Sequence, residues 1–175
     1  WVLDPVAAGA ITLRTEFARE LCRMNPAIIR GNASEIMALA GVSGQGRGVD
    51  SGNASDEAVD AAMRLAKSAS CVVMVTGEVD YITDGKDLFG CLNGNLLLTR
   101  VTGVGCAQGA LAAACLAVCD HPMEAALASA VIMGIAGEMA AAVSPRPGSF
   151  QIALLDALDS IDADVILGKG RLKID

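Results

Sequence analysis

Aromatic side chains make up only 3% of the 175 residues, so the hydrophobic core has to be built from Ala, Val, Leu, Ile and Met. Basic residues are also few, because 20 Asp and Glu outnumber 13 Lys and Arg and leave a net charge of -7. The Lys and Arg nowhere form a run, whereas a nucleic-acid-binding surface usually needs a basic cluster. The composition therefore predicts a protein without a nucleic-acid partner.

Two well-known phosphate-binding motifs are missing as well. A Walker A loop ends in Gly-Lys-Ser/Thr, but the glycine-rich stretch of this chain ends in Gly109 and Ala110. A dinucleotide-binding fingerprint needs a second strand with an acidic residue at its end. Asp120 lies at a plausible distance, but it ends the predicted helix directly, without an intervening strand. The sequence argues against a P-loop NTPase and matches a dinucleotide site only weakly.

No secretory signal peptide and no linker-like change of composition occur, so we expect one domain with a sizeable core. Residues 101–119 carry no charge, but they include three glycines and more Ala than Leu. This composition favours a buried helix over a membrane span. The chain starts without Met, at an apolar run that reads as the inside of a strand, so we expect that an N-terminal part of the natural protein precedes Trp1.

The cysteines lack the spacing of a disulfide module. Six are scattered through apolar stretches: Cys22, Cys71, Cys91, Cys106, Cys115 and Cys119. Scattered cysteines are typical of reduced thiols, so we predict a cytoplasmic protein. Cys115 and Cys119, at i and i+4, share one predicted helix face and His121 follows them, but no obvious fourth ligand is present, which makes a zinc site the less favoured interpretation.

The most informative stretch that is present reads Val101-Thr102-Gly103-Val104-Gly105-Cys106-Ala107-Gln108-Gly109. It follows an apolar run and predicts a glycine-rich turn that opens a helix reaching Cys119. The start of a helix presents backbone N–H groups without partners and a positive potential, which together favour an anion. Cys106 falls in the first turn, where the same potential favours a thiolate. A plain strand-to-helix turn with a buried cysteine explains the local sequence equally well.

Further candidates follow short apolar runs that predict strands. Asp4 ends the first run and is expected to hold a metal or a phosphate-bound water, or else to be a turn former before Pro5. Arg30 emerges at the end of a strand at 27–29, where its guanidinium is a natural fork for phosphate oxygens. Glu35 follows Asn32 at capping-box spacing. It is therefore either a functional residue of the phosphate site or only the capping-box partner of Asn32 at the start of the helix 33–40.

The remaining pattern predicts helices at 15–24, 53–69, 123–143 and 150–161, and a buried strand at 71–75 that ends in Thr76, Gly77 and Glu78. Thr76 offers its hydroxyl to a phosphate. A hairpin pairs 81–83 with 88–91 around Asp84-Gly85, and Asn93-Gly94 is expected to turn the chain into another strand at 96–99. The polar loop 44–52 either brings Arg47 and Asp50 to the site or is simply a solvated surface loop, and 162–175 forms a tail.

Several of these motifs, taken in order, resemble the hydroxyethylthiazole kinases, which have the ribokinase-like fold. The resemblance covers nearly the whole chain to about Ala157 and rests on Asp4-Pro5-Val6, Arg30-Gly31-Asn32-Ala33-Ser34-Glu35-Ile36, Gly46-Arg47-Gly48-Val49-Asp50, Thr76-Gly77-Glu78, Thr102-Gly103-Val104-Gly105-Cys106 and Pro147-Gly148-Ser149-Phe150. It implies a three-layer α/β/α fold with a mostly parallel central sheet and an antiparallel edge. Residues 1–161 would form a partial kinase domain that lacks its N-terminal strands, followed by the tail at 162–175.

The resemblance also implies an activity: ATP- and Mg²⁺-dependent phosphorylation of the primary hydroxyl of 4-methyl-5-(2-hydroxyethyl)thiazole in thiamine salvage. The roles it implies are ATP binding by Arg30 and Thr76, support of Mg²⁺ and its waters by Asp4 and Glu35, contact with the thiazole by Gly103, and a catalytic position beside the transferred phosphoryl for Cys106. The full-length protein is expected to form a homotrimer with sites between subunits.

One position departs from the family pattern, since Val104 stands where Thr or Ser is usual and a hydroxyl near the phosphates is therefore missing. Two other functions stay open at this stage. One is a ribokinase-like kinase for a hydroxymethylpyrimidine or pyridoxal-type alcohol, against which Cys106 argues because the wider group usually has Asp there. The other is an inactive nucleotide-binding homologue with a regulatory role.

Overall fold

The computed structural model describes residues 1–42 and 51–174, with the backbone alone for 51–56. The predicted site candidates Arg47 and Asp50 lie outside the described residues. The described strands form one six-stranded sheet in which spatial order follows chain order. These strands are β1 (Val2–Leu3), β2 (Ile28–Asn32), β3 (Val72–Thr76), β4 (Asp80–Thr83), β5 (Leu88–Cys91) and β6 (Leu172–Ile174).

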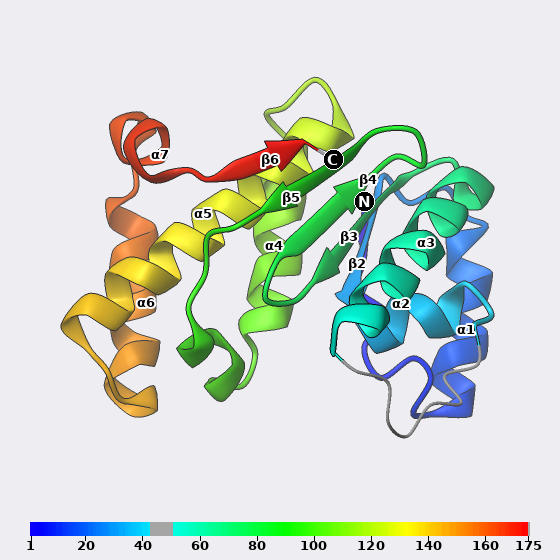
Figure 1. Ribbon diagram of the computed structural model, residues 1–175, viewed down its shortest axis with the longest axis horizontal. Helices are drawn as coiled ribbons and strands as arrows, with labels where there is room; N and C mark the ends of the chain where they lie inside the picture. The colour runs from blue at the N-terminus through cyan, green and yellow to red at the C-terminus, as the bar shows by residue number, and fades with distance from the viewer. Residues whose placement is uncertain (43–50, 175) are drawn as a thin grey trace.

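The first three strands run parallel and the others pair antiparallel, which confirms the predicted α/β sheet with an antiparallel edge. The helices are α1 (Thr12–Cys22), α2 (Ala33–Leu39), α3 (Ser51–Ala69), α4 (Val104–Leu116), α5 (Pro122–Val143), α6 (Pro147–Ser160) and α7 (Ala163–Lys169). α1, α2 and α3 lie on one side of the sheet, α4 and α5 lie on the other, and α6 packs outside α5 (Figure 1).

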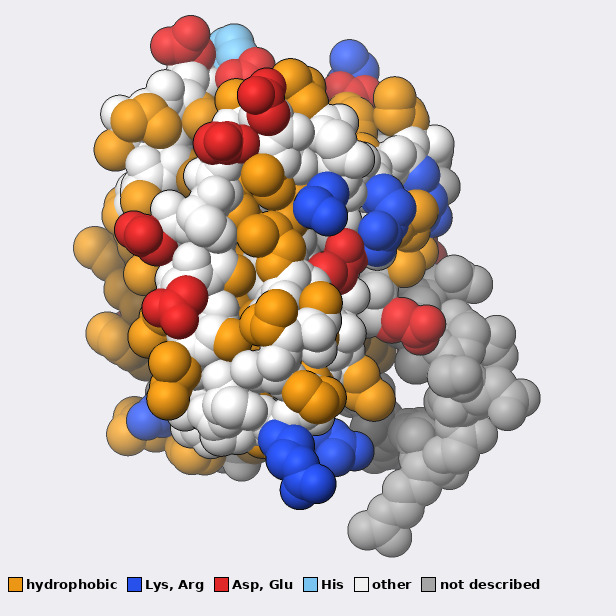
Figure 2. Space-filling model, turned by 90° about the vertical axis from the view of Figure 1, so that its left-hand side faces the viewer, with side chains coloured by type: hydrophobic (Ala, Val, Ile, Leu, Met, Phe, Trp, Pro, Cys, Tyr) orange, Lys and Arg blue, Asp and Glu red, His pale blue; other side chains and the backbone are white. Residues whose placement is uncertain are grey.

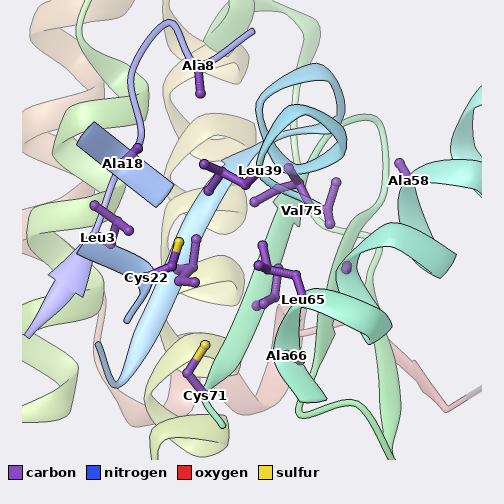
Figure 3. Close-up of a cluster of buried hydrophobic side chains, with 14 residues drawn as sticks. Leu3, Ala8, Ala18, Cys22, Leu39, Ala58, Leu65, Ala66, Cys71 and Val75 are labelled. Carbon is purple, nitrogen blue, oxygen red and sulfur yellow. The ribbon is translucent and has the colours of Figure 1, made fainter. Parts of the chain in front are cut away.

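Alternation along β2 and β3 builds a separate core on each face of the sheet, because successive strand residues point to opposite faces. Ile29 and Val73, which are register partners, belong to the hydrophobic cluster under α1, α2 and α3. Figure 3 shows this cluster, with Leu39 of α2 and Leu65 of α3 among its labelled members. Ile28 and Met74 pack under α4 and α5. Ile28 and Ile29 are fully buried, and each contributes roughly 1.5–3 kcal/mol to folding. The small aromatic content is thus offset by aliphatic cores on both faces.

Helix α5 approaches the segment between β5 and α4 very closely. A Cβ at Gly134 would lie 2.6 Å from the carbonyl oxygen of Asn93, and one at Gly137 would lie 2.7 Å from Leu98 Cδ1. Glycine at both positions therefore lets this segment press against the helix. Of the helices in the described ranges, α5 alone is long and apolar enough to cross a membrane, but 56% of that apolar window is buried inside the protein, as in a core helix.

The strand predicted at 96–99 is wrong, since Leu96–Arg100 forms a 3₁₀ helix, η1. The Asn95 side chain accepts a hydrogen bond from the backbone N–H of Leu97 and so caps this short helix. Such a local bond gives the backbone an alternative to pairing in a sheet. The next strand beside β5 comes from residues 172–174, part of the predicted tail, because Leu172 and Ile174 pair with Cys91 and Phe89.

Candidate active site

A pocket of about 730 Å³ opens where β2 and β3 end and β4 begins. Its polar wall includes Arg30, Asn32, Thr76, Asp80, Asn93 and Gln108. Its apolar wall includes Leu96, Leu98, Val101, Val104 and Met133, contributed by η1, α4, α5 and the segments between them. Ligands of open α/β sheets bind beyond the carboxyl ends of parallel strands, so the pocket lies where the fold predicts a site.

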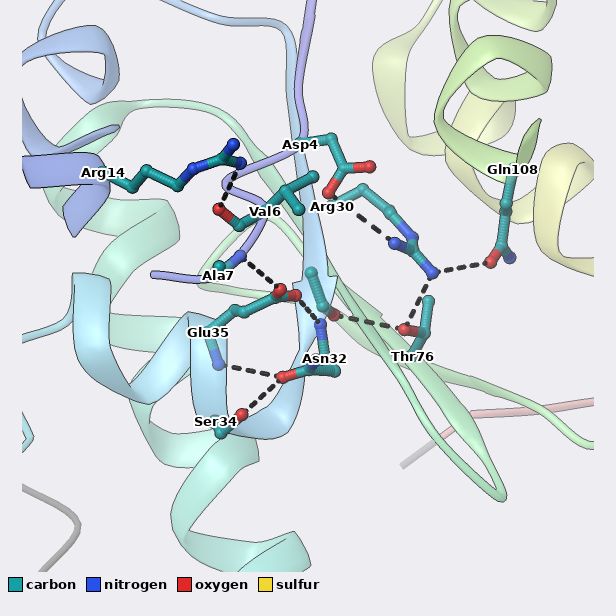
Figure 4. A network of polar contacts seen from close by, with 11 residues as sticks. Asp4, Val6, Ala7, Arg14, Arg30, Asn32, Ser34, Glu35, Thr76 and Gln108 are labelled. Carbon is teal, nitrogen blue, oxygen red and sulfur yellow. Dashed lines mark hydrogen bonds and ion pairs between the residues drawn. The ribbon is translucent and has the colours of Figure 1, made fainter. Parts of the chain in front are cut away.

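Arg30 is the buried charge of this pocket, with only 9% of its surface exposed. The expectation that it ends its strand is wrong, because β2 continues to Asn32 and Arg30 pairs with Met74 in mid-strand. The long side chain nevertheless reaches the strand end, where Nη2 donates to Thr76 Oγ1 at 3.2 Å (Figure 4). The same Nη2 donates to Gln108 Oε1 at 3.3 Å. Arg30 thus bridges the sheet and α4.

The glycine-rich turn opens a helix as predicted. Gly103 has a φ of 92° and is the N-cap of α4, which begins at Val104. This left-handed conformation favours glycine. A Cβ at Gly105 would lie 2.8 Å from Arg30 Nη1, so the missing side chain lets the guanidinium lie against the first turn of the helix. Both features concentrate positive potential at one place, since the early N–H groups of a helix have no partners within it.

Cys106 lies in the first turn of α4 and is exposed, so the alternative of a buried structural cysteine is wrong. Gly103 is exposed as well, and the space around its position is open for at least 4 Å. Neither residue lines the 730 Å³ pocket. The structure therefore gathers Arg30 and Thr76 inside the pocket and leaves Gly103 and Cys106 on the adjoining surface of the helix start.

Glu35 does form the capping box that the sequence offered as an alternative. Its backbone N–H donates to Asn32 Oδ1 at 3.0 Å, and its Oε2 accepts from the Asn32 N–H at 2.9 Å. Its other oxygen, Oε1, accepts from the Ala7 N–H at 3.0 Å (Figure 4). These bonds fasten α2 to the loop that follows β1. That loop begins with Asp4, so the capping carboxylate also brings two acidic side chains into one region.

Asp4 is half-buried and faces Arg30, with 3.7 Å between Oδ1 and Nη1. Burial raises the pKa of this carboxyl; the Arg30 charge opposes the shift and the Glu35 charge adds to it. Asp4 Oδ1 is buried without a hydrogen-bond partner. An unpartnered buried oxygen beside a second carboxylate suits a hard cation such as Mg²⁺. Within 1–42 and 51–174 no cluster of three or more metal-ligating side chains occurs, so most ligands of such an ion would be waters or phosphate oxygens.

Two polar groups of the pocket were not singled out from the sequence. Asp80 accepts from the Gly77 N–H at 2.9 Å and from Gln108 Nε2 at 3.4 Å. Burial raises the pKa of Asp80, and these two hydrogen bonds and the Arg30 charge oppose the rise. The only available signal was their place in predicted motifs, because Asp80 follows Thr76-Gly77-Glu78 and Gln108 lies within the glycine-rich stretch.

A further polar cluster fixes the far wall of the pocket. The buried Asn93 side chain donates to Glu138 at 3.2 Å and to the carbonyl of Lys169 at 2.9 Å, and it accepts from the Arg171 N–H at 2.7 Å. Arg171 also forms an ion pair with Glu138 at 2.6 Å. The segment before η1 is thereby attached to α5 and to the chain between α7 and β6.

Comparisons with known proteins agree with this geometry. The model of the hydroxyethylthiazole kinase family matches residues 1–164. The hydroxyethylthiazole kinases of Akkermansia muciniphila and Tolumonas auensis are 52% and 53% identical over 171 and 168 residues. These alignments cover 98% and 95% of this chain and 63% of each relative, so the chain spans about 63% of their length.

Among solved structures, that of a hydroxyethylthiazole kinase protein from Pyrococcus horikoshii is similar, with a TM-score of 0.89 and 37% identity. The similarity covers 99% of this chain and 65% of that one. The family match extends over β1 to β5, the turn before α4 and the buried arginine. The chain belongs to the hydroxyethylthiazole kinase family.

Proposed function

We propose that the protein carrying this chain transfers the γ-phosphoryl of ATP to the primary hydroxyl of 4-methyl-5-(2-hydroxyethyl)thiazole, a step of thiamine salvage. The observation that carries the proposal is the Arg30 guanidinium lying against the first turn of α4 at the wall of the pocket. Phosphoryl transfer depends mainly on alignment and on positive potential around the moving group. A buried arginine beside unpartnered helix N–H groups supplies that potential.

In this proposal Arg30 and the Thr76 hydroxyl contact the ATP phosphates, and the N–H groups from Gly103 to Cys106 face the transferred phosphoryl. The open space at Gly103 accommodates the thiazole. Two observations support these roles: Arg30 Nη2 and Thr76 Oγ1 are already joined at 3.2 Å, and both residues line the pocket. The Val104 side chain contributes apolar surface where a hydroxyl is usual in the family.

Asp4 and Glu35 would hold Mg²⁺ and its waters, and the unpartnered Asp4 Oδ1 supports this role. The ion, when bound, neutralises charge on the phosphates. Arg30 keeps its own contact with Asp4, so the two carboxylates carry a compensating positive charge from the protein as well. The acidic pair and the arginine together orient the phosphate tail toward the start of α4.

For Cys106 we propose a role beside the attacking alcohol, supported by its exposed place in the first turn of α4. A thiol is a poor base at neutral pH, so we assign it a supporting role in placing the hydroxyl. We therefore expect Cys106→Asp to retain substantial activity. Complete loss of turnover in that variant, with ATP binding preserved, would contradict this role.

We also propose that the full-length protein is a cytoplasmic homotrimer without a nucleic-acid or membrane partner. Apolar side chains that a second copy could cover support the assembly, since Ile152 and Leu155 of α6 are 67% and 65% exposed. Figure 2 shows hydrophobic side chains gathered between acidic ones on the side of the molecule that carries α6 and α7. Exposed apolar surface of this kind often marks an interface.

The test uses the full-length protein with Mg²⁺, ATP and the thiazole alcohol, and it detects the phosphate ester by mass spectrometry. Hydroxymethylpyrimidine and pyridoxal serve as competing substrates. Formation of the thiazole phosphate with the highest kcat/KM is expected. ATP binding without phosphorylation of any of the three alcohols would instead indicate a nucleotide-binding homologue.

Arg30→Gln gives the residue-level test, with the exposed Arg146→Gln as the matched control. The Arg30 substitution should raise the KM for ATP at an unchanged KM for the thiazole, because it removes positive charge from the phosphate region only. If the KM for ATP stays the same in both variants, Arg30 does not bind the nucleotide.

A further inference from the structure

We propose that Asp80 and Gln108 form a hydrogen-bonded relay that holds the Arg30 guanidinium in place to receive the ATP phosphates. The proposal rests on the proposed function. The three residues come from β4, α4 and β2, and 78 residues separate Arg30 from Gln108 along the chain. Asp80 and Gln108 are positioning residues, since they act on the nucleotide through Arg30.

The relay has one chemically consistent arrangement. Gln108, 5% exposed, turns Oε1 toward Arg30 Nη2 at 3.3 Å and Nε2 toward Asp80 Oδ2 at 3.4 Å. The reversed amide would face the guanidinium with its NH₂ and the carboxylate with its oxygen, which would set donor against donor and acceptor against acceptor. The Asp80 carboxylate therefore determines which end of the amide Arg30 meets.

Asp80 is itself held by the backbone, because its Oδ1 accepts from the Gly77 N–H at 2.9 Å. Gly77 directly follows Thr76, whose hydroxyl is the other acceptor for Arg30 Nη2. The turn between β3 and β4 thus fixes both acceptors at one end of the guanidinium. Through Gln108 the relay also reaches α4, whose first turn lies against the same guanidinium at Gly105.

The relay matters because Arg30 has a competing partner. Its Nη1 already lies 3.7 Å from Asp4 Oδ1, and its Nε has no hydrogen-bond partner. Without Gln108 and Thr76 on the opposite side, the guanidinium would move onto the Asp4 carboxylate and form a closer ion pair. A guanidinium that is paired closely with Asp4 would offer fewer N–H groups to a phosphate. Asp4 Oδ1 would then no longer be available to a cation.

A charge-swap experiment separates the relay from a purely structural role of Asp80. Asp80→Asn keeps an oxygen for the Gly77 N–H but turns an NH₂ toward Gln108, which forces the Gln108 amide to reverse and to face Arg30 with its own NH₂. Adding Gln108→Glu supplies a carboxylate at position 108 that accepts from both neighbours. The double variant has the wild-type net charge and restores an acceptor for Arg30.

Measurements on the full-length protein comprise the Kd of Mg²⁺-ATP by calorimetry, the KM values for ATP and for the thiazole, and the Tm. We expect Asp80→Asn to raise the Kd and KM for ATP about tenfold, at an unchanged KM for the thiazole, and the double variant to return both to within about threefold of wild type. Asp87→Asn, in the loop of the same hairpin, and Gln151→Glu, on the surface of α6, are the matched controls and should leave all values unchanged.

Two results would overturn the relay: an unchanged ATP Kd in Asp80→Asn, or a double variant that binds ATP as weakly as Asp80→Asn alone or more weakly. A wild-type protein that binds ATP but does not phosphorylate the thiazole would refute the proposed function alone. The relay could still be tested in that case, because its test is the Kd of Mg²⁺-ATP in the variants. An active wild type with an unaffected Asp80→Asn variant would refute the relay alone.

Discussion

Gly105→Ala should weaken ATP binding and also lower the stability of the fold slightly. The added Cβ would lie 2.8 Å from Arg30 Nη1, 3.1 Å from Nη2 and 3.3 Å from Cζ. Ordinary contact begins near 3.4 Å, so the guanidinium has to retreat by at least about 0.6 Å. The end of an arginine side chain can yield by this amount, whereas a backbone group could not.

This displacement of the guanidinium also disturbs the hydrogen bonds that orient Arg30. Its bonds to Thr76 and Gln108 already span 3.2 and 3.3 Å, and a further displacement of this size would break at least one of them. A hydrogen bond to a charged group is worth about 1.5–3 kcal/mol, which corresponds to roughly a ten- to hundredfold loss of affinity if that bond sets the phosphate-binding position. Ala is favoured over Gly within helices by about 0.5–1 kcal/mol, and this gain offsets only part of the lost hydrogen bond.

The assay is calorimetric titration of the full-length protein with Mg²⁺-ATP, paired with thermal unfolding. Gly148→Ala is a close control, because Gly148 is likewise the second residue of its helix, α6, and a Cβ there would meet nothing within 4 Å. The control should keep wild-type affinity. Equal ATP affinity in both variants, or an equal loss in both, would refute the argument that Arg30 needs the space above Gly105.

Three further predictions concern stability and reactivity. Burial raises the pKa of Asp80 in the folded protein above its unfolded value of 3.8. The Asp80 side chain therefore contributes its full stabilisation below pH 3.8, and this stabilisation is lost as the pH rises through the folded pKa. In denaturant titrations, the wild type should gain stability relative to Asp80→Asn as the pH falls from 7 toward 4. Cys106, which is exposed, should react with iodoacetamide faster than the buried thiols, and Mg²⁺-ATP should slow this reaction. Peptide mass spectrometry measures the extent of labelling at each cysteine. Equal labelling of Cys106 with and without nucleotide would show that it lies away from the phosphates. Gly134→Ala should lower the unfolding free energy by about 1–3 kcal/mol, because its Cβ would meet the Asn93 backbone at 2.6 Å; Gly168→Ala, with nothing within 4 Å, should not, and a similar loss in both would contradict the packing argument.

Local chemistry made several elements predictable from the sequence. The apolar run before Thr76 forms β3, and Asp84-Gly85 turns the hairpin between β4 and β5. Gly103 starts α4, and Asn32 with Glu35 makes the capping box of α2. Each of these features depends on residues no more than a few positions apart, so the information was present in the local sequence.

Local patterns misled where two structures were equally compatible with the same residues. The apolar residues at 96–99 suit a strand, but the side chain of Asn95 caps a 3₁₀ helix and leaves the sheet edge to residues 172–174. The strand that carries Arg30 likewise extends further than its apolar residues indicated, because pairing with β3 continues as far as Thr76. In the second case the partner strand decided the outcome, and it lies far away along the chain; in the first, the side-chain cap at Asn95 did.

The sequence by itself determined the α/β class, the glycine-opened helix start and the residue types that could handle phosphate. Only the tertiary structure decided that Arg30 lies between Asp4 on one side and Thr76 and Gln108 on the other, and that the first turn of α4 closes over it. The physical reason is distance along the chain: these contacts join residues 46 and 78 positions apart. Such contacts form only when the sheet and α4 pack together, and no local pattern encodes that packing.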